Sequence, residues 1–149
     1  MLIKGIIFDW RRTLYNPVNG SLMDGAKQLL NFLKKNKYKL ALVTSSADEK
    51  ARVEQVKKFG LYGYFDSITI SPAKDVKDFL KAMREMDVGK ENALVVGDSI
   101  YSEISTTKIM GLKTVWLLSG EPPETDDEEP DSVIERLADL KNILDKLNR

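Results

Sequence analysis

Five short apolar segments alternate with stretches of helical periodicity along this chain, and this alternation limits the possible folds more than any other feature. The segments span residues 3–9, 40–44, 67–70, 93–98 and 114–118. Short runs rich in Ile, Val and Leu are typical of strands buried on both faces. Strands that alternate with helices form parallel sheets through right-handed crossovers. We therefore predict an α/β fold, Rossmann-like, with three α/β/α layers around a central parallel sheet of about five strands.

The helical stretches are expected over residues 24–36, 47–59, 75–86 and about 102–111, and a final amphipathic helix is expected to begin at Asp131. The acidic, proline-containing stretch 120–130 is interpreted as a solvated connection. Neither an internal repeat nor a linker divides the sequence. The pattern therefore predicts a single domain over residues 1–149.

The chain contains no cysteine and no histidine. This composition excludes zinc–thiolate sites, cysteine nucleophiles and Ser-His-Asp triads. The 23 Lys and Arg residues balance 23 Asp and Glu residues, so charge gives no reason to expect a nucleic acid or an anionic membrane as partner. No apolar stretch approaches the roughly 20 residues of a membrane span or resembles a signal peptide. We expect a soluble, cytoplasmic protein.

Polar side chains stand where the expected strands end. Asp9 ends the first strand, Thr44 and Ser45 the second, and Asp98 the fourth, while Lys74 follows the third. Each residue alone is common in a turn or a helix cap, but ligands of open parallel sheets bind at this carboxyl edge. A pair of carboxylates suits Mg²⁺, whereas hydroxyl, backbone N–H and ammonium groups suit phosphate oxygens. The joint placement favours a site for phosphoryl chemistry.

Three segments and one lysine carry a resemblance to a known family. Residues 8–14, Phe-Asp-Trp-Arg-Arg-Thr-Leu, resemble the first motif of the haloacid dehalogenase-like (HAD) superfamily, Asp-x-Asp-x-Thr-Leu after an apolar strand. Residues 42–45, Leu-Val-Thr-Ser, resemble its second motif, and residues 96–103, Val-Gly-Asp-Ser-Ile-Tyr-Ser-Glu, its fourth. Lys74 is the best match for the lysine of the third motif, and Lys77 is a second candidate. The order and approximate spacing match over nearly the whole chain.

The resemblance implies a Mg²⁺-dependent phosphatase. By this resemblance, Asp9 is the nucleophile that forms an aspartyl-phosphate, and it also binds Mg²⁺. The backbone carbonyl of Arg11 and the carboxylate of Asp98 would complete the protein ligands of the metal, with Glu103 in support.

The resemblance also implies a set of residues around the phosphoryl group. Thr44 would bind the transferred group, with Ser45 beside it, and Lys74 would offset the charge of both the phosphate and Asp9. Phosphoryl transfer through a loose transition state depends mainly on positioning and on charge compensation, which these residue types can supply.

The sequence departs from the family pattern directly after the nucleophile. Phosphatases of the family usually carry an acid–base Asp two residues after the nucleophile, where this chain has Arg11, and Arg12 replaces the usual glycine that follows. Arginine stays charged and cannot exchange that proton. One hypothesis is therefore a slow or leaving-group-selective phosphatase in which Arg11 clamps an anionic substrate. The alternative is a catalytically impaired module that binds a phosphorylated ligand or a protein partner.

Two other classes fit the sequence less well. A metal-free dehalogenase of the same family would leave Asp98 and Glu103 without a cation to bind. A phospho-accepting receiver domain would carry an Asp after the third strand, where this chain has Ile70, Ser71 and Pro72.

The intervals between the motifs leave no room for a cap domain of the kind that many family members insert. A capless site is open to solvent, so the substrate could be a phosphorylated small molecule or a macromolecular phosphate. A neighbouring subunit of an oligomer could then serve as the lid.

Two aromatic residues each stand close after a motif aspartate. Packing is the favoured role for Trp10 and Tyr101, and stacking on an aryl or base group of the substrate is the alternative.

Overall fold

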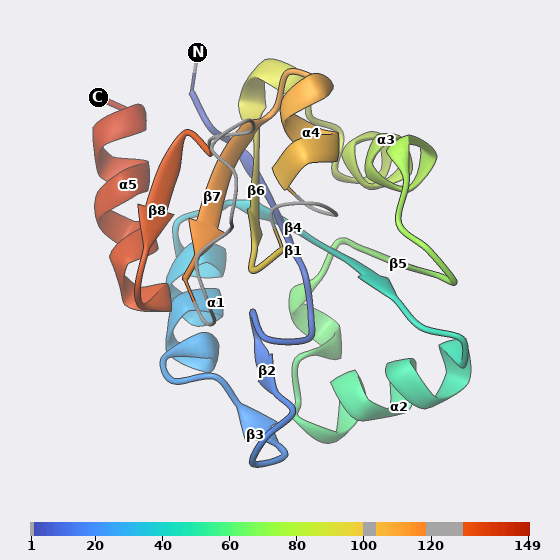
Figure 1. Ribbon diagram of the computed structural model, residues 1–149. Helices are drawn as coiled ribbons and strands as arrows, with labels where there is room; N and C mark the ends of the chain where they lie inside the picture. The colour runs from blue at the N-terminus through green and yellow to red at the C-terminus, as the bar shows by residue number, and fades with distance from the viewer. Residues whose placement is uncertain (1, 100–103, 119–129) are drawn as a thin grey trace.

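A six-stranded parallel sheet forms the centre of the protein (Figure 1). The structure, a computed structural model, describes residues 2–99, 104–118 and 130–149. Within these residues the strand order is β5-β4-β1-β6-β7-β8, and every neighbouring pair is parallel. The strands are β1 (Gly5–Phe8), β4 (Lys39–Ser45), β5 (Ser67–Ser71), β6 (Ala93–Gly97), β7 (Lys113–Leu117) and β8 (Ser132–Ile134). The α/β fold and the five expected strands are confirmed, and β8 adds a sixth.

The expected start of the last helix was wrong, because β8 lies where the helix was predicted to begin. The carboxylate of Asp131 accepts hydrogen bonds from the backbone N–H and the hydroxyl of Thr114, at 2.9 and 3.1 Å, which holds this segment beside β7. The helical turn η4 (Leu137–Asp139) follows, and α5 (Leu140–Leu147) then packs on the sheet. The predicted acidic connection lies almost wholly outside the described residues.

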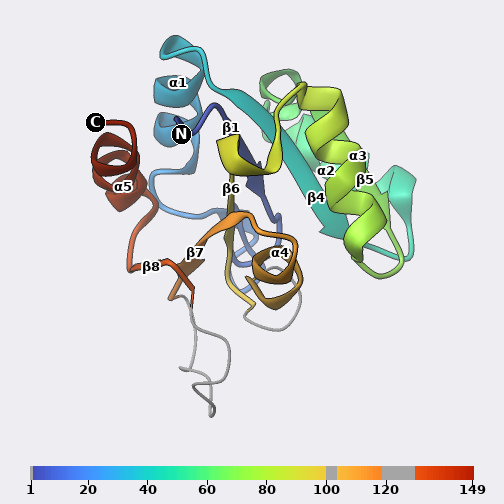
Figure 2. The same ribbon diagram turned by 90° about the horizontal axis from the view of Figure 1, so that it is seen from above.

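Helices cover both faces of the sheet, as the three-layer prediction requires (Figures 1 and 2). One core cluster joins α1 and α5 to one face, and a second joins α3 to the other. In Figure 2, α1 and α5 lie together on the side away from α3 and α4. The remaining helices are α1 (Ala26–Lys35), α2 (Glu49–Lys58), α3 (Val76–Met86), α4 (Ser105–Ile109) and the short η1 (Tyr62–Tyr64) and η2 (Lys90–Asn92). No helix among the described residues is both long and apolar enough to cross a membrane.

The segments between the motif strands are short. A two-stranded hairpin, β2 (Tyr15–Asn16) and β3 (Ser21–Leu22), and then α1 connect β1 to β4. The hairpin lies between the expected strand 3–9 and the expected helix 24–36, where the sequence predicted no strand. Only α2 and η1 connect β4 to β5.

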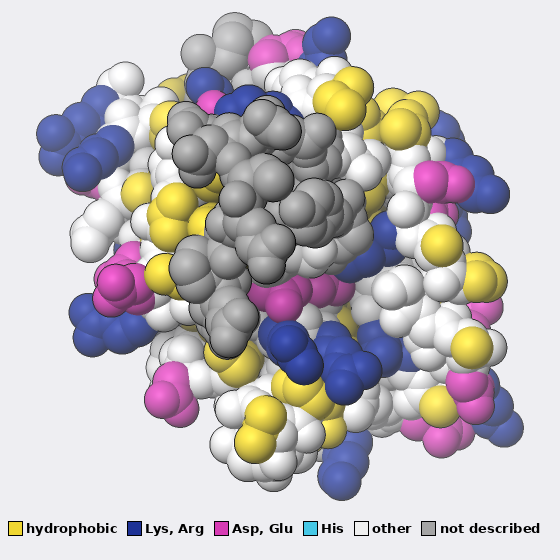
Figure 3. Space-filling model, viewed as in Figure 1, with side chains coloured by type: hydrophobic (Ala, Val, Ile, Leu, Met, Phe, Trp, Pro, Cys, Tyr) yellow, Lys and Arg dark blue, Asp and Glu magenta, His cyan; other side chains and the backbone are white. Residues whose placement is uncertain are grey.

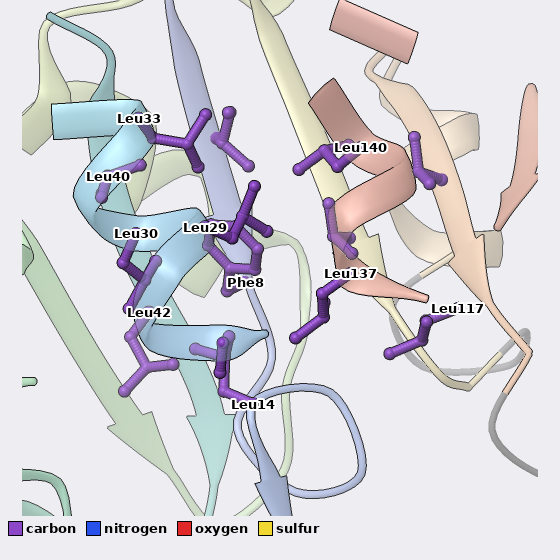
Figure 4. Packing of buried hydrophobic residues seen from close by; sticks show 14 of the residues in the cluster. Phe8, Leu14, Leu29, Leu30, Leu33, Leu40, Leu42, Leu117, Leu137 and Leu140 are labelled. Atoms are coloured by element: carbon purple, nitrogen blue, oxygen red, sulfur yellow. The ribbon is translucent and has the colours of Figure 1, made fainter. Parts of the chain in front are cut away.

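The larger core fixes β1 so that its carboxyl end meets the pocket described below. Figure 4 shows Phe8 packed among leucines of α1, β4 and η4, including Leu29, Leu42 and Leu137, and all of these side chains are buried. Burying one side chain of this size stabilises the folded state by about 1.5–3 kcal/mol. Because β1 is apolar and buried as far as Phe8, the first polar side chain after it, Asp9, lies at the edge of the sheet.

Candidate active site

A pocket of about 640 Å³ lies at the carboxyl ends of β1, β4 and β6. Its charged side chains are seen in Figure 3 near the centre of the face, where acidic groups lie directly beside Lys and Arg. The lining residues are Asp9, Arg11, Arg12, Thr44, Ser45, Arg52, Pro72, Ala73, Lys74, Asp98 and Ser99. Six of the seven site residues proposed from the sequence therefore share one pocket. The seventh, Glu103, lies outside the described residues.

Lys74 and Asp9 form a buried ion pair in this pocket. The ammonium nitrogen of Lys74 lies 2.9 Å from Oδ1 of Asp9, and the two side chains are 5% and 7% exposed. An ion pair that is shielded from water in this way is not screened as a surface pair is. Lys77, the second lysine candidate, lies outside the pocket, with its side chain 80% exposed beside Asp75. The geometry places Lys74 and not Lys77 at the aspartate.

Asp98 lies beside Asp9 in the pocket. Burial, then the negative charge of Asp9 and a hydrogen bond with its carboxylate, raise the pKa of Asp98 from 3.8 to about 6. The indole N–H of Trp116 donates to the backbone carbonyl of Asp98 at 2.9 Å and fixes the turn after β6. Two adjacent carboxylates repel each other, so a cation between them relieves the repulsion.

The carboxylate pair fits a hard divalent cation. Mg²⁺ takes oxygen ligands, retains several waters and needs only one or two protein carboxylates. Among the described residues no third His, Cys, Asp or Glu joins Asp9 and Asp98. The two carboxylates are therefore oxygen donors of the kind that Mg²⁺ prefers, and Arg11 lines the same pocket.

Arg52 lines the pocket and was not predicted from the sequence. It lies on α2 and donates through Nη1 to the hydroxyl of Thr44, and to the backbone carbonyl of Ser45 at 3.3 Å. Burial lowers the pKa of Arg52, and the nearby charge of Asp9 opposes that shift. Only its place beside Thr44 in the folded chain reveals Arg52, because α2 is a polar helix without a motif.

The loop after β1 carries Arg11 and Arg12 to the rim of the pocket. Arg12 has a left-handed backbone, with φ of 65°, and its N–H donates to the carbonyl of Tyr15 at 2.6 Å. A non-glycine residue in this conformation costs about 1–2 kcal/mol, which explains why glycine is usual at this position of the motif. The backbone of Arg11 forms an isolated β-bridge with that of Tyr15, and Arg11 lines the pocket.

A buried carboxylate closes the loop that carries Lys74. One oxygen of Asp78 accepts hydrogen bonds from the hydroxyl of Ser71 and from the N–H of Asp75, each at 3.0 Å. Asp75 in turn caps α3, and the two aspartates form a capping box. Asp78 therefore fixes both ends of the segment around Lys74.

Trp10 is a packing residue, as favoured from the sequence. Its side chain is 0% exposed and stacks on Tyr15 with ring centroids 5.6 Å apart. Its indole N–H donates to the side-chain oxygen of Gln55 on α2 at 2.7 Å. A fully buried ring cannot stack on a substrate. Tyr101, the other aromatic candidate, lies outside the described residues.

Together the parallel sheet and the pocket define an α/β protein that gathers acidic and basic side chains at the carboxyl edge of its sheet. Residues 3–117 match the haloacid dehalogenase-like hydrolase family, to which the chain belongs.

Two relatives illustrate the likeness. The chain is 34% identical over 132 residues to glyceraldehyde 3-phosphate phosphatase of Pyrococcus furiosus, a match that covers 83% of this chain and 55% of the relative. It is 34% identical over 126 residues to pyrophosphatase PpaX of Bacillus cereus, covering 78% of this chain and 56% of the relative. The chain thus spans about half the length of these relatives.

The fold is also similar to solved structures. That of the putative HAD-hydrolase YfnB from Bacillus subtilis, described as bound to magnesium, matches with a TM-score of 0.86 at 17% sequence identity. The match covers 97% of this chain and 99% of that one, and it supports the fold alone.

Proposed function

We propose that the protein is a Mg²⁺-dependent phosphatase that acts through an aspartyl-phosphate on Asp9. The observation that carries this proposal is the buried cluster in which Asp9 contacts both Lys74 and Asp98. Asp9 is paired with the ammonium group of Lys74, while Asp98 retains a proton up to about pH 6 in the absence of metal. Such a cluster is costly to bury unless it binds something.

The proposed ligands of Mg²⁺ are the carboxylates of Asp9 and Asp98 and the backbone carbonyl of Arg11, with Glu103 in support. When bound, the ion supplies positive charge to the phosphoryl oxygens and orients the phosphate for in-line attack. Lys74 supplies a second positive charge in contact with Asp9.

The chain's own residues divide the reaction into two displacements. An oxygen of Asp9 bonds to phosphorus as the bond between phosphorus and the leaving oxygen breaks. A water oxygen then bonds to the same phosphorus, the bond to Asp9 breaks, and inorganic phosphate leaves with the carboxylate restored. The Thr44 hydroxyl, held by Arg52, and the neighbouring Ser45 would bind the phosphoryl oxygens during both displacements.

Arg11 makes the proposed enzyme dependent on its leaving group. A positioned acid–base group contributes about 10²–10⁴-fold to the rate, and Arg11 cannot exchange a proton near neutral pH. The leaving groups of aryl and acyl phosphates depart without being protonated, so the hydrolysis of these substrates would be affected least.

The substrate proposed is a phosphorylated small molecule. The names of the two relatives, a glyceraldehyde 3-phosphate phosphatase and a pyrophosphatase, support this class. We also propose a single capless domain over residues 1–149, because only a hairpin and α1 separate β1 from β4, and only α2 and η1 separate β4 from β5. An open site of this kind also admits a macromolecular phosphate.

The second candidate function is a binding module for a phosphorylated ligand or partner. It is favoured by one observation, the cationic side chain of Arg11 where catalysis would need an acid. The test is a panel of aryl, acyl and alkyl phosphates with and without Mg²⁺. The phosphatase proposal predicts Mg²⁺-dependent release of phosphate that Asp9→Asn abolishes and that Asp145→Asn, on the exposed face of α5, leaves intact. Binding of Mg²⁺ and phosphate without any turnover would favour the binding module.

A further inference from the structure

Two arginines from different parts of the fold line the pocket beside the phosphoryl-binding groups. Arg11 comes from the loop after β1, whereas Arg52 projects from α2. None of the ion pairs in the described part of the chain involves either residue. Figure 3 shows Lys and Arg side chains gathered at this place on the surface. Arg12 lines the same pocket.

The positive charge in the pocket exceeds what one phosphate group can neutralise. Among the described lining residues, Lys74, Arg11, Arg12 and Arg52 contribute four positive charges against the two carboxylates of Asp9 and Asp98, a net charge of two. A divalent cation at the carboxylates would raise that charge to four, and the carboxylate of Glu103, proposed to support the metal, would lower it to three. The dianion of a phosphate monoester supplies two negative charges, so it does not neutralise these groups.

The two guanidinium groups lie near enough to repel each other. The charge of Arg11 contributes to lowering the pKa of Arg52, after the larger effect of burial. An anion bound between two guanidinium groups removes such repulsion, and planar guanidinium groups suit the paired oxygens of a carboxylate or phosphate. The pocket volume of about 640 Å³ leaves space for such a group beside the phosphoryl group.

We propose that Arg11 and Arg52 form a second anion subsite, so that the preferred substrate carries a carboxylate or a second phosphate close to the phosphoryl group that is removed. This inference rests on the proposed phosphatase function and deepens it by naming the substrate class. Arg11, at the position of the usual acid–base aspartate, then recognises the leaving group by its charge. A carboxylate in its place would repel the same substrate.

Three substrates with the same two-carbon skeleton test the subsite. The probes are 2-hydroxyethyl phosphate, carboxymethyl phosphate and the bisphosphate of ethylene glycol, and the readout is the ratio of kcat/KM for each anionic probe to that for the hydroxyl probe. Charge-assisted hydrogen bonds predict a ratio of at least about tenfold in the wild type. Arg11→Gln and Arg52→Gln should bring it close to one, and Arg84→Gln, an exposed arginine of α3 outside the pocket, should preserve it. Whichever anionic probe has the higher ratio identifies the second group as carboxylate or phosphate.

A binding measurement separates failure of the subsite from failure of the phosphatase proposal. Calorimetry in the presence of Mg²⁺ compares the affinities for 3-phosphonopropionate and 3-hydroxypropylphosphonate. Neither of these phosphonates can be hydrolysed. Preference for the carboxylated probe that Arg11→Gln removes supports the subsite even if the protein turns over no substrate. Equal binding and equal turnover of charged and uncharged probes by the wild type would overturn the subsite and leave the phosphatase proposal standing. Loss of the preference in Arg84→Gln would also overturn it, because the effect would then be one of overall charge.

Discussion

The ammonium group of Lys74 lies 2.9 Å from a carboxylate oxygen of Asp9, although 65 residues separate them in the chain and both side chains are almost fully buried. Removing one partner of a buried ion pair typically costs 3–5 kcal/mol, because the other charge is then left uncompensated. The fold nevertheless places a third charged group, Asp98, against the same aspartate. A contribution to stability does not readily explain such a cluster of buried charges. The binding of a ligand explains it better.

The charge of Asp98 predicts how stability depends on pH in the metal-free protein. Its pKa is raised to about 6, mainly by burial and by Asp9, so the folded state holds this proton more tightly than the unfolded chain does. The stability that this bound proton contributes is fully present below about pH 4 and is lost as the pH rises through about 6. In EDTA, Asp98→Asn should therefore gain stability relative to the wild type over this interval, as thermal unfolding can measure. A stability difference that does not change with pH would contradict the coupling of the two carboxylates.

Binding of Mg²⁺ should offset the loss of stability that ionisation of Asp98 causes in the metal-free protein. At pH 7.5 and a concentration 100-fold above its Kd, the ion should stabilise the wild type by about 2.7 kcal/mol. Asp98→Asn should lose most of that gain, since it removes one of the two carboxylates. Equal stabilisation of both proteins would place the metal elsewhere.

Replacing Arg11 by Asp should restore the acid–base group that the motif normally carries. We expect kcat on alkyl phosphates to rise by about 10²–10⁴-fold, with a much smaller gain on aryl phosphates, whose leaving groups need no proton. Arg11→Asn serves as the control, because it removes the positive charge without supplying a proton. The same gain in both variants would show that the charge of Arg11, and not a missing acid, limits the reaction.

Removing the carboxylate of Asp78 should impair Lys74 through the loop between them. Asp78→Ala leaves the N–H of Asp75 without its acceptor and the Ser71 hydroxyl with only the carbonyl of Ala73, which should destabilise the protein by about 1–3 kcal/mol and lower kcat more than it raises KM. Asp139→Ala is the matched control, since Asp139 belongs to the capping box of η4, away from the pocket. Urea unfolding and steady-state kinetics separate the two effects. An unchanged kcat in a folded Asp78→Ala protein would show that the loop holds Lys74 without this carboxylate.

Two tryptophans should differ in what their replacement does. Trp10→Phe loses the hydrogen bond to Gln55 and part of the stack on Tyr15, so it should cost about 1–3 kcal/mol of stability with little change in the Kd for Mg²⁺. Trp116→Phe frees the carbonyl of Asp98 and should weaken Mg²⁺ binding. Calorimetric titration of each variant measures that Kd. Equal effects on the metal would contradict the assignment of Trp10 to packing.

The sequence predicted the placement of Asp9, Thr44 and Asp98 because each stands at the end of an apolar run. Once β1, β4 and β6 are parallel neighbours, Asp9, Thr44 and Asp98 must lie at one edge. The hydrophobic pattern is local, and the topology follows from the alternation of strands with helices. Lys74 could not be separated from Lys77 in this way, because the loop conformation set by Asp78 decides which lysine points inward.

Features that depend on distant contacts could not be predicted. The strand β8 has only three residues, and it forms where Asp131 meets Thr114, 17 residues away. The amphipathic pattern of the following helix concealed it. Arg52 stands on a polar helix of ordinary composition, and only the packing of α2 beside β5 and η1 brings it to Thr44.

The most direct test of the central claim is to trap the covalent intermediate. An aryl phosphate should release its phenol in a burst that approaches one equivalent per protein, because Arg11 cannot activate water against the phosphoenzyme. Acid quenching during the burst, followed by proteolysis and mass spectrometry, should locate the phosphate on the peptide that contains Asp9 and on its side chain. Asp9→Asn should give neither the burst nor the modified peptide. Mg²⁺-dependent hydrolysis by the wild type without covalent phosphate, or with phosphate on another residue, would contradict the account.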